Sequence, residues 1–139
     1  DQIDCVWLAV DHIGMLGAMI TAGSGPIPRA LLNDAIDVTD SETLLLSLPV
    51  IGQSKEFADA ASFSGLAQRG FFVYDWSDVH RTGEALNAYE LHAAPSSRLR
   101  FCDLPEHMRS YAFGIDVTLG TKLLTLPWSS NLFASPATP

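Results

Sequence analysis

Short apolar runs divide the chain, and turn-forming residues separate them at close intervals. Residues 4–22 read DCVWLAVD, HIG and MLGAMITA, which places two strand-like runs on either side of a tight connection. This pattern predicts a β-hairpin. Gly14 is expected to take the positive φ of the turn, and the Asp11 carboxylate is expected to accept hydrogen bonds from the turn backbone.

A helical segment is predicted over residues 28–69. Pro28 is placed for the first turn of a short helix through RALLNDAI. A second helix, in TDSETLLLSLP, is expected to begin at Asp40 or Ser41, both of which are good N-cap residues. SKEFADAASFSGLAQR, residues 54–69, predicts a third helix whose apolar face is made mainly of small side chains.

From residue 71 the apolar period changes from helical to two, which predicts a strand-rich segment over residues 71–119. FFVYDW and ALNAYELHA are strand-like, and alternation also predicts strands in SRLRFCD (97–103) and FGIDVTL (113–119). DLPEHMRSYA predicts one more helix, capped by Asp103. The tail, residues 128–139, is rich in breakers and is expected to fray.

Hairpin-like strand pairs with helices between them favour an α+β fold in one domain over a doubly wound one. We predict a mainly antiparallel sheet with two to four short helices packed on it. The 139 residues suffice for a single core. The predicted core residues are Trp7, Leu8, Phe71, Phe72, Leu99, Phe101, Phe113, Ile115 and Val117.

Charge and apolar content limit the classes of function. Sixteen acidic against eight basic residues give a net charge of −8, which argues against binding to nucleic acid or to an anionic membrane surface and suits a basic partner. Acidity of this kind is also common in soluble proteins that need it for solubility alone. The apolar runs are too short to cross a bilayer, and no signal-peptide pattern precedes them, so a cytoplasmic location is predicted. Cys5 and Cys102 are expected to be buried, reduced thiols.

The stretch FFVYDWSDVHRTGEALNAYELH, residues 71–92, concentrates polar and aromatic residues and allows two interpretations. The first is a hydrolase site. If Tyr89 and Leu91 face the core, Glu90 and His92 point together to the wet side of the strand, and a hairpin would bring His80 opposite them.

An alternative hydrolase would pair Cys102 with His107, near a helix start. The spacing between His80 and His92 matches no known ligand signature, so neither a metal nor another cofactor is expected. These enzyme interpretations are less favoured than a binding role, and no catalytic residue is assigned.

The second interpretation is a protein-binding surface, because interfaces are enriched in Trp, Tyr and Arg anchors ringed by polar groups. Strand alternation would turn Trp76 inward, so a core position is equally open for it. A second acidic run precedes the helix at residue 41. The predicted partner-binding residues are Asp75, Trp76, Asp78, His80, Arg81, Glu84, Asp34 and Asp37.

The opening VWLAVDHIGMLGAMITAGSGPIP resembles that of small acidic immunity proteins from bacterial polymorphic-toxin loci, in type VI secretion or contact-dependent inhibition systems. The resemblance rests on Trp7 in a first strand that ends at Asp11, on Gly14 in the turn, and on residues 21–28 at the exit. These residues are expected to be structural.

The resemblance implies a cytoplasmic bacterial protein, without catalysis, that binds and neutralises one cognate toxin. Many such toxins are basic and act on nucleic acids. An acidic inhibitor would then cover the toxin's active site in place of phosphate charge.

Overall fold

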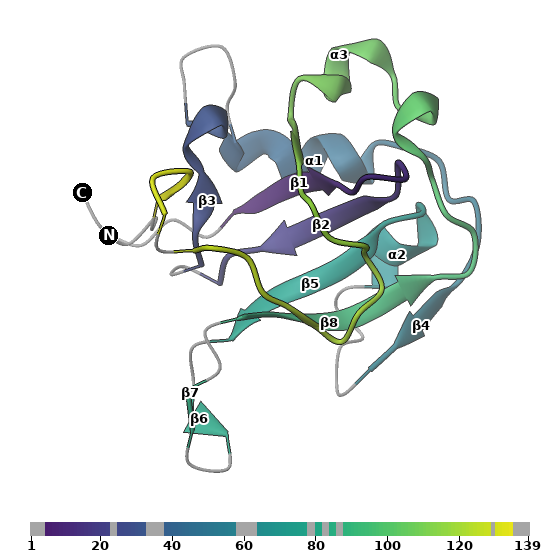
Figure 1. The fold of residues 1–139 in the computed structure, drawn as a ribbon. Helices are drawn as coiled ribbons and strands as arrows, with labels where there is room; N and C mark the ends of the chain where they lie inside the picture. The colour runs from purple at the N-terminus through teal and green to yellow at the C-terminus, as the bar shows by residue number, and fades with distance from the viewer. Residues whose placement is uncertain are drawn as a thin grey trace.

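The structure is a computed structural model that describes residues 5–22, 25–32, 38–57, 64–77, 80–81, 84–85, 88–128 and 130–134, with the backbone alone at 77, 80–81 and 84–85. It forms a single α+β domain, as predicted, around a mixed seven-stranded sheet (Figure 1). The strand order is β10-β8-β5-β2-β1-β9, and β4 also pairs with β8. The strands of this sheet are β1 (Val6–Val10), β2 (Leu16–Ile20), β4 (Ser54–Glu56), β5 (Phe72–Ser77), β8 (Ala88–Pro95), β9 (Ala112–Gly114) and β10 (Leu123–Leu124).

Antiparallel pairing dominates the sheet, but two pairs, β1 with β9 and β2 with β5, are parallel. Two small two-stranded sheets stand beside it. These are β3 (Ile27–Pro28) with β11 (Phe133–Ala134), and β6 (His80–Arg81) with β7 (Glu84–Ala85). The helices are α1 (Ser41–Leu46), α2 (Ser64–Gln68) and α3 (Glu106–Arg109), with 3-10 turns η1 (Arg29–Leu31), η2 (Val38–Asp40) and η4 (Phe101–Asp103).

The predicted hairpin at residues 4–22 is confirmed as β1 and β2. Gly14 has φ +91°, the left-handed conformation that its turn requires. One oxygen of the Asp11 carboxylate accepts hydrogen bonds from the backbone N–H groups of Ile13 (3.0 Å) and Met15 (2.9 Å), and the other accepts one from Leu119 (2.9 Å). The buried carboxylate therefore fixes the turn and also ties it to the C-terminal segment.

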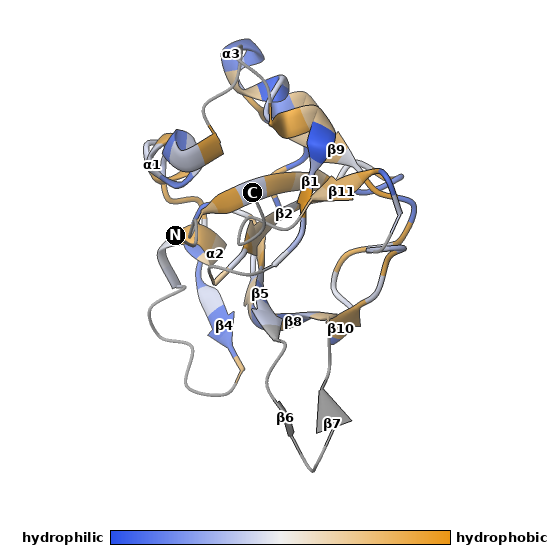
Figure 2. Ribbon diagram, turned by 90° about the vertical axis from the view of Figure 1, so that its left-hand side faces the viewer, coloured by the Kyte–Doolittle hydropathy of each residue, from blue (hydrophilic) through white to orange (hydrophobic). Residues whose placement is uncertain are grey.

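Both faces of the central sheet are covered, and this gives the domain three layers. Leu45 of α1, Leu66 of α2 and Met108 of α3 pack with Leu8 on one face. The C-terminal segment and β3 cover the other face, where Trp7 is buried. Figure 2 shows the hydrophobic colour along β1 and polar residues on the outer turn of α3. The central strands β1 and β2 are thus buried on both sides.

The segment that leaves the hairpin is held by an aromatic hydrogen-bond group. The Trp7 Nε1–H group lies within hydrogen-bond distance of the Pro26 carbonyl (3.1 Å) and the Tyr89 hydroxyl (3.0 Å), and the same hydroxyl donates to Pro26 (2.9 Å). A Cβ at Gly25 would lie 2.7 Å from the Tyr89 hydroxyl and 2.8 Å from the Trp76 Cβ. The GPIP exit is therefore structural, because only glycine fits against these rings.

Several predicted elements differ from the structure. Residues 54–56 form strand β4, and the helix predicted over 54–69 is represented in the described chain only by α2. Residues 97–103 lie in bends and η4 instead of a strand, because Phe101 N–H donates to the Gly14 carbonyl and draws this segment onto the hairpin turn. The strand predicted over 113–119 reduces to β9 at its start.

The predicted helix after Asp103 exists as α3, but Pro105 occupies its N-cap position. The Asp103 carboxylate instead accepts a hydrogen bond from the Arg100 N–H at the start of η4. Asp40 is the N-cap residue of α1 and makes no side-chain cap bond.

Most of the predicted core is confirmed. Trp7, Leu8, Phe71, Phe72 and Ile115 are buried. The remaining predicted core residues are half-buried against the two clusters, and they are Leu99, Phe101, Phe113 and Val117.

Two predictions about particular segments are corrected. Cys5 is a buried thiol, but Cys102 is exposed because η4 lies on the surface. The described part of the tail is ordered into β11 rather than frayed, since Phe133 is buried and pairs in register with Pro28. Residues 129 and 135–139 lie outside the described residues. In the described part of the chain, no helix is both long and apolar enough to cross a bilayer.

Candidate functional site

The outer edge of β8 is covered by two short strands that leave a gap between them. Glu56 of β4 pairs in register with Ala93, and Leu123 of β10 pairs with Glu90. At the junction the Phe57 N–H donates to the His92 carbonyl (2.9 Å), and the Leu91 N–H donates to the carbonyl of residue 122 (2.8 Å). The two strands therefore meet the same edge from opposite ends, and a hollow forms where they stop.

This hollow, which we call the edge pocket, has a volume of about 710 Å³. That size is within the range of small-ligand sites. Its charged groups come from three separate parts of the chain. The lining residues are Glu56, Phe57, Glu90, Leu91, His92, Gly120 and Lys122.

A β-bulge places His92 at the pocket. Tyr74 of β5 is opposite Leu91, but the preceding residue, Val73, is opposite Ala93, so His92 is the extra residue of β8. Leu91 consequently joins the cluster around Trp7, whereas Ala93, only two positions later, packs with the other cluster. Bulges change the direction of side chains in this way and are over-represented beside functional sites.

Glu90 and His92 come together in the edge pocket. His92 Nε2 lies 3.6 Å from Glu90 Oε1, and the side chains are 15% and 12% exposed, respectively. Tyr89 and Leu91 are buried toward the core, as the strand alternation predicted. The two polar side chains do not lie on an open wet face, however, because β4 and β10 wall them in.

Asp75 and Trp76, two of the predicted partner-binding residues, lie beside this pair. Asp75 is opposite Glu90 in the register of β5 and β8 and is half-buried. Trp76 is also half-buried, and its ring makes edge contacts with Tyr89 (centroids 5.1 Å apart) and Trp128 (5.8 Å). One carboxylate of the predicted surface therefore adjoins the edge pocket, and Trp76 is anchored in the aromatic cluster.

The other predicted partner-binding residues are only partly described. His80 pairs in register with Ala85, and Arg81 with Glu84, in the β6–β7 ribbon that continues from the ends of β5 and β8 (Figure 1). The side chains of His80, Arg81 and Glu84 lie outside the described atoms. The remaining predicted residues, Asp34, Asp37 and Asp78, lie outside the described residues altogether.

The second hydrolase pair is not assembled. Cys102 Sγ lies 4.0 Å from Asp103 Oδ1, and no hydrogen bond among the described residues joins Cys102 to His107. Of the two hydrolase candidates, only Glu90 and His92 approach each other.

Among the described residues, no group of three or more His, Cys, Asp or Glu side chains is placed to hold a metal ion. Comparison of the chain with models of known protein families, with curated proteins and with solved structures finds no match. The fold and the edge pocket must therefore support any functional inference directly.

Sequence reasoning missed half of the pocket. Glu56 and Phe57 were assigned to a helix, and Lys122 was not considered. No local pattern identifies them, because they reach the edge pocket only through the pairing of β4 and β10 with β8. The polar pair on β8 was foreseeable, because Glu90 and His92 are two positions apart in a strand-like segment.

Proposed function

We propose that this protein is a non-catalytic binding module that neutralises a cognate toxin, in the manner of the immunity proteins that its opening residues resemble. The observation that carries the proposal is the acidic end of the β5–β8 pair. There Asp75 lies opposite Glu90, and the chain continues into the β6–β7 ribbon. Acidic residues at the end of a sheet suit contact with a basic active site.

The chain's charge supports the same proposal. A net charge of −8 would speed encounter with a basic toxin and reject acidic proteins. The toxin would act in the cytoplasm of a bacterium. A toxin that acts on nucleic acid fits best, because its active site must carry positive charge. The acidic surface would then occupy the place of phosphate groups.

The test is protection. The protein is co-expressed with the toxin domain encoded by the adjacent gene, and growth, complex formation and residual toxin activity are measured. We expect restored growth, a tight complex and loss of toxin activity. Continued killing, with both proteins present in the cell, would refute the proposal.

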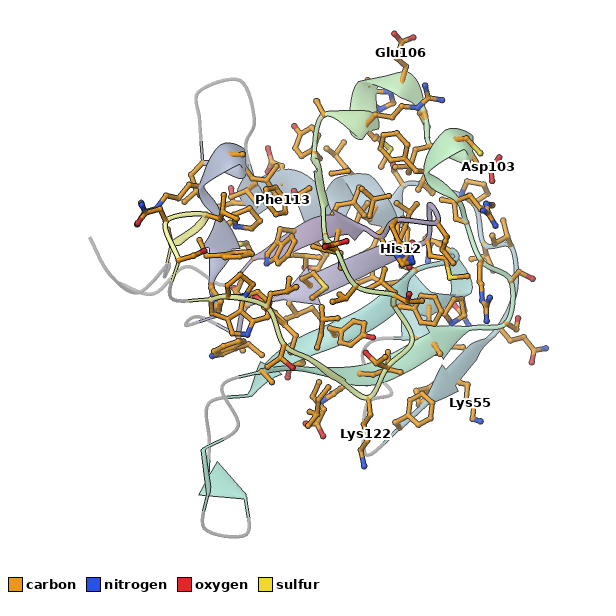
Figure 3. The ribbon with its side chains drawn as sticks, in the orientation of Figure 1. His12, Lys55, Asp103, Glu106, Phe113 and Lys122 are labelled. Atoms are coloured by element: carbon orange, nitrogen blue, oxygen red, sulfur yellow. The ribbon has the colours of Figure 1, made fainter. Side chains whose placement is uncertain are left out.

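The surface is tested by charge reversal. Asp75→Lys should weaken the complex and flatten its dependence on salt, since screened charge pairs supply the steering. Glu106→Lys is the matched control, because Glu106 is exposed on α3 and lies far from the pocket end of the sheet in Figure 3. Equal affinities for both variants would exclude Asp75 from the interface.

A second candidate function rests on the Glu90–His92 pair, whose placement in a pocket favours a small hydrolase over a plain surface. A carboxylate that orients an imidazole is a recurring general-base arrangement. Turnover of ester, amide or phosphoester substrates that is abolished by His92→Gln, with the toxin unaffected by the protein, would favour this candidate.

A further inference from the structure

Strand β9 ends the central sheet on the side away from β10, as Figure 2 shows, and among the described strands it pairs with β1 alone. Its sequence, Ala-Phe-Gly, contains neither a charged residue nor a proline. The strands on the other side carry such charges, because β4 contains Lys55 and Glu56 and Lys122 comes directly before β10. Charged residues of this kind keep edge strands from pairing with other chains. The β9 edge therefore lacks a protection that the opposite edge has.

The backbone groups of β9 point alternately to β1 and to the outside of the sheet. The Ile115 N–H donates to the carbonyl of Val10 (2.9 Å), which is the register partner of Gly114. In this parallel ladder the groups of Phe113 also face β1, so the N–H and C=O groups of Ala112 and Gly114 face outward. Within the described chain, none of these four outward groups has a hydrogen-bond partner. The edge thus presents the pattern that an additional strand would satisfy.

Gly114 also leaves space for a side chain of an added strand. It is exposed, and a methyl group at this position would meet no atom within 4 Å. Val10 beside it is half-buried and packs against the apolar cluster under the helices. Large aromatic side chains stabilise sheets when they lie across from an edge glycine. A bulky apolar residue opposite Gly114 would cover Val10 in the same way.

Charge indicates which kind of chain suits this edge. Asp116 is exposed two positions after Gly114, and no basic residue occurs in the sequence between Arg109 and Lys122. A second copy of the chain would bring its own net charge of −8, and such like charge opposes self-association. A basic segment is attracted by the same field. The edge therefore suits a basic partner better than a second copy.

We propose that β9 binds an extended, basic segment of a partner protein by strand addition. The segment hydrogen-bonds with the outward backbone groups of Ala112 and Gly114, places a large apolar side chain over Gly114, and brings a basic side chain near Asp116. Strands β1 and β2 separate β9 from β5, so this surface is distinct from the one around Asp75. The proposal consequently holds whether or not the partner is a toxin.

Hydrogen exchange tests whether the edge is open in the free protein. Amide exchange is followed by NMR on the isotope-labelled full chain. The N–H groups of Phe113 and Ile115 face β1 and should exchange slowly, whereas those of Ala112 and Gly114 should exchange at least about 100-fold faster. Equal protection of all four amides would mean that the edge is already covered and would overturn the proposal.

Three synthetic peptides test strand addition on the same labelled chain. The first, acetyl-Lys-Thr-Phe-Thr-Lys-amide, is called the lysine peptide. The second replaces both lysines by glutamates, and the third carries N-methyl-phenylalanine, which removes the central backbone donor. We expect saturable shifts of the Ala112 and Gly114 amide signals with the lysine peptide, and binding at least about fivefold weaker with the other two. Equal binding of all three, or no saturable shift at these amides, would refute strand addition.

Variants locate the site on the backbone. Gly114→Pro removes one outward N–H, which an edge strand tolerates, and should weaken the lysine peptide at least about fivefold. Gly114→Ala keeps the N–H and should lose less. Asp116→Asn should weaken the lysine peptide, while Glu42→Gln removes the same charge at an exposed position of α1 and should leave its affinity unchanged. Unchanged affinity in both the proline and the asparagine variants would place the peptide elsewhere.

Sedimentation of the protein alone decides between a partner and a second copy. We expect a monomer over a wide range of concentration, with rapid exchange of the Gly114 amide throughout. A dimer that Gly114→Pro dissociates would show that a second copy occupies the edge, and the assignment to a partner protein would then be wrong.

Discussion

Four consecutive side chains of β1, from Val6 to Ala9, are buried, whereas the outer edge of β8 alternates buried residues with a carboxylate and an imidazole. β1 lies between β2 and β9 and has an apolar layer above and below it. The edge of β8 has only short strands to cover it, and they stop before they meet. The fold is therefore stabilised where both faces of a strand are packed, and polar side chains lie at the edge of the sheet where the packing is incomplete.

The two regions also differ in backbone regularity. The register of β1 with β2 is unbroken over five residue pairs. The pairing of β5 with β8 contains the bulge at His92. A regular ladder keeps alternate side chains on the same face, while the bulge puts Leu91 and Ala93 on opposite faces of the sheet.

Of the variants that test this contrast, Trp7→Ala is expected to lose the most stability. The Trp7 ring is fully buried, touches Tyr89 and Phe113 edge-on, and donates a hydrogen bond to Pro26. Truncation should lower the free energy of unfolding by about 3–5 kcal/mol. Urea denaturation measures this loss. Ile13→Ala, at a side chain 43% exposed, should stay within about 0.5 kcal/mol of the parent protein. Similar losses for both would contradict a packed centre.

Gly25→Ala tests the aromatic group at the hairpin exit. The new methyl group would meet the Tyr89 hydroxyl and the Trp76 Cβ, and displacing these rings should cost about 1–3 kcal/mol in unfolding free energy. Gly114→Ala is the control, because a Cβ there meets nothing within 4 Å. Thermal unfolding of both variants gives the comparison. If Gly25→Ala were as stable as the parent protein, the exit segment would be able to move without loss of stability.

The hairpin and the α+β class were predictable from sequence because their determinants are local. Asp11 contacts backbone groups within four residues, and Gly14 supplies the turn conformation. The prediction of a strand over residues 97–103 was wrong for the opposite reason. Its alternation is genuine, but Arg100 donates to the Ile13 carbonyl (2.7 Å) and bridges Met15, so a contact distant in sequence decides its shape.

Half of the candidate site was predictable for a similar reason. The alternation around Glu90 and His92 correctly turned Tyr89 and Leu91 inward. The bulge could not be foreseen, since it depends on how β5 meets β8. Nor could the walls of the edge pocket, because three separate segments form them.

Alkaline pH tests the buried tyrosines of the central layers. Burial raises the pKa of Tyr74 above its ordinary value of about 10. The unfolded chain therefore ionises first, so stability is intact below about pH 10 and declines as the pH rises above that value. Burial also raises the pKa of Tyr89, which adds to the decline. Urea unfolding near pH 8 and near pH 11 measures it.

Tyr74→Phe separates the two tyrosines. The variant loses the hydrogen bonds that the Tyr74 hydroxyl makes with the Thr121 carbonyl (2.7 Å) and the Gly120 N–H (2.9 Å), so it should be less stable at neutral pH. Its further loss between neutral and alkaline pH should nevertheless be smaller than that of the parent protein. An unchanged alkaline loss would place the titrating group elsewhere.

The smallest stability effect is expected at the edge pocket. Glu90→Gln weakens the contact with His92, whose Nε2 lies 3.6 Å from Glu90 Oε1, but it also removes the like-charge contact with Asp75, so the two changes offset each other. The free energy of unfolding should change by less than about 1 kcal/mol, because cross-strand charge pairs contribute no more than this. Urea denaturation of this variant and of Trp7→Ala under the same conditions compares the two losses of unfolding free energy. A loss as large as that of the tryptophan variant would make the pair part of the core and would remove the distinction between a packed centre and a polar edge.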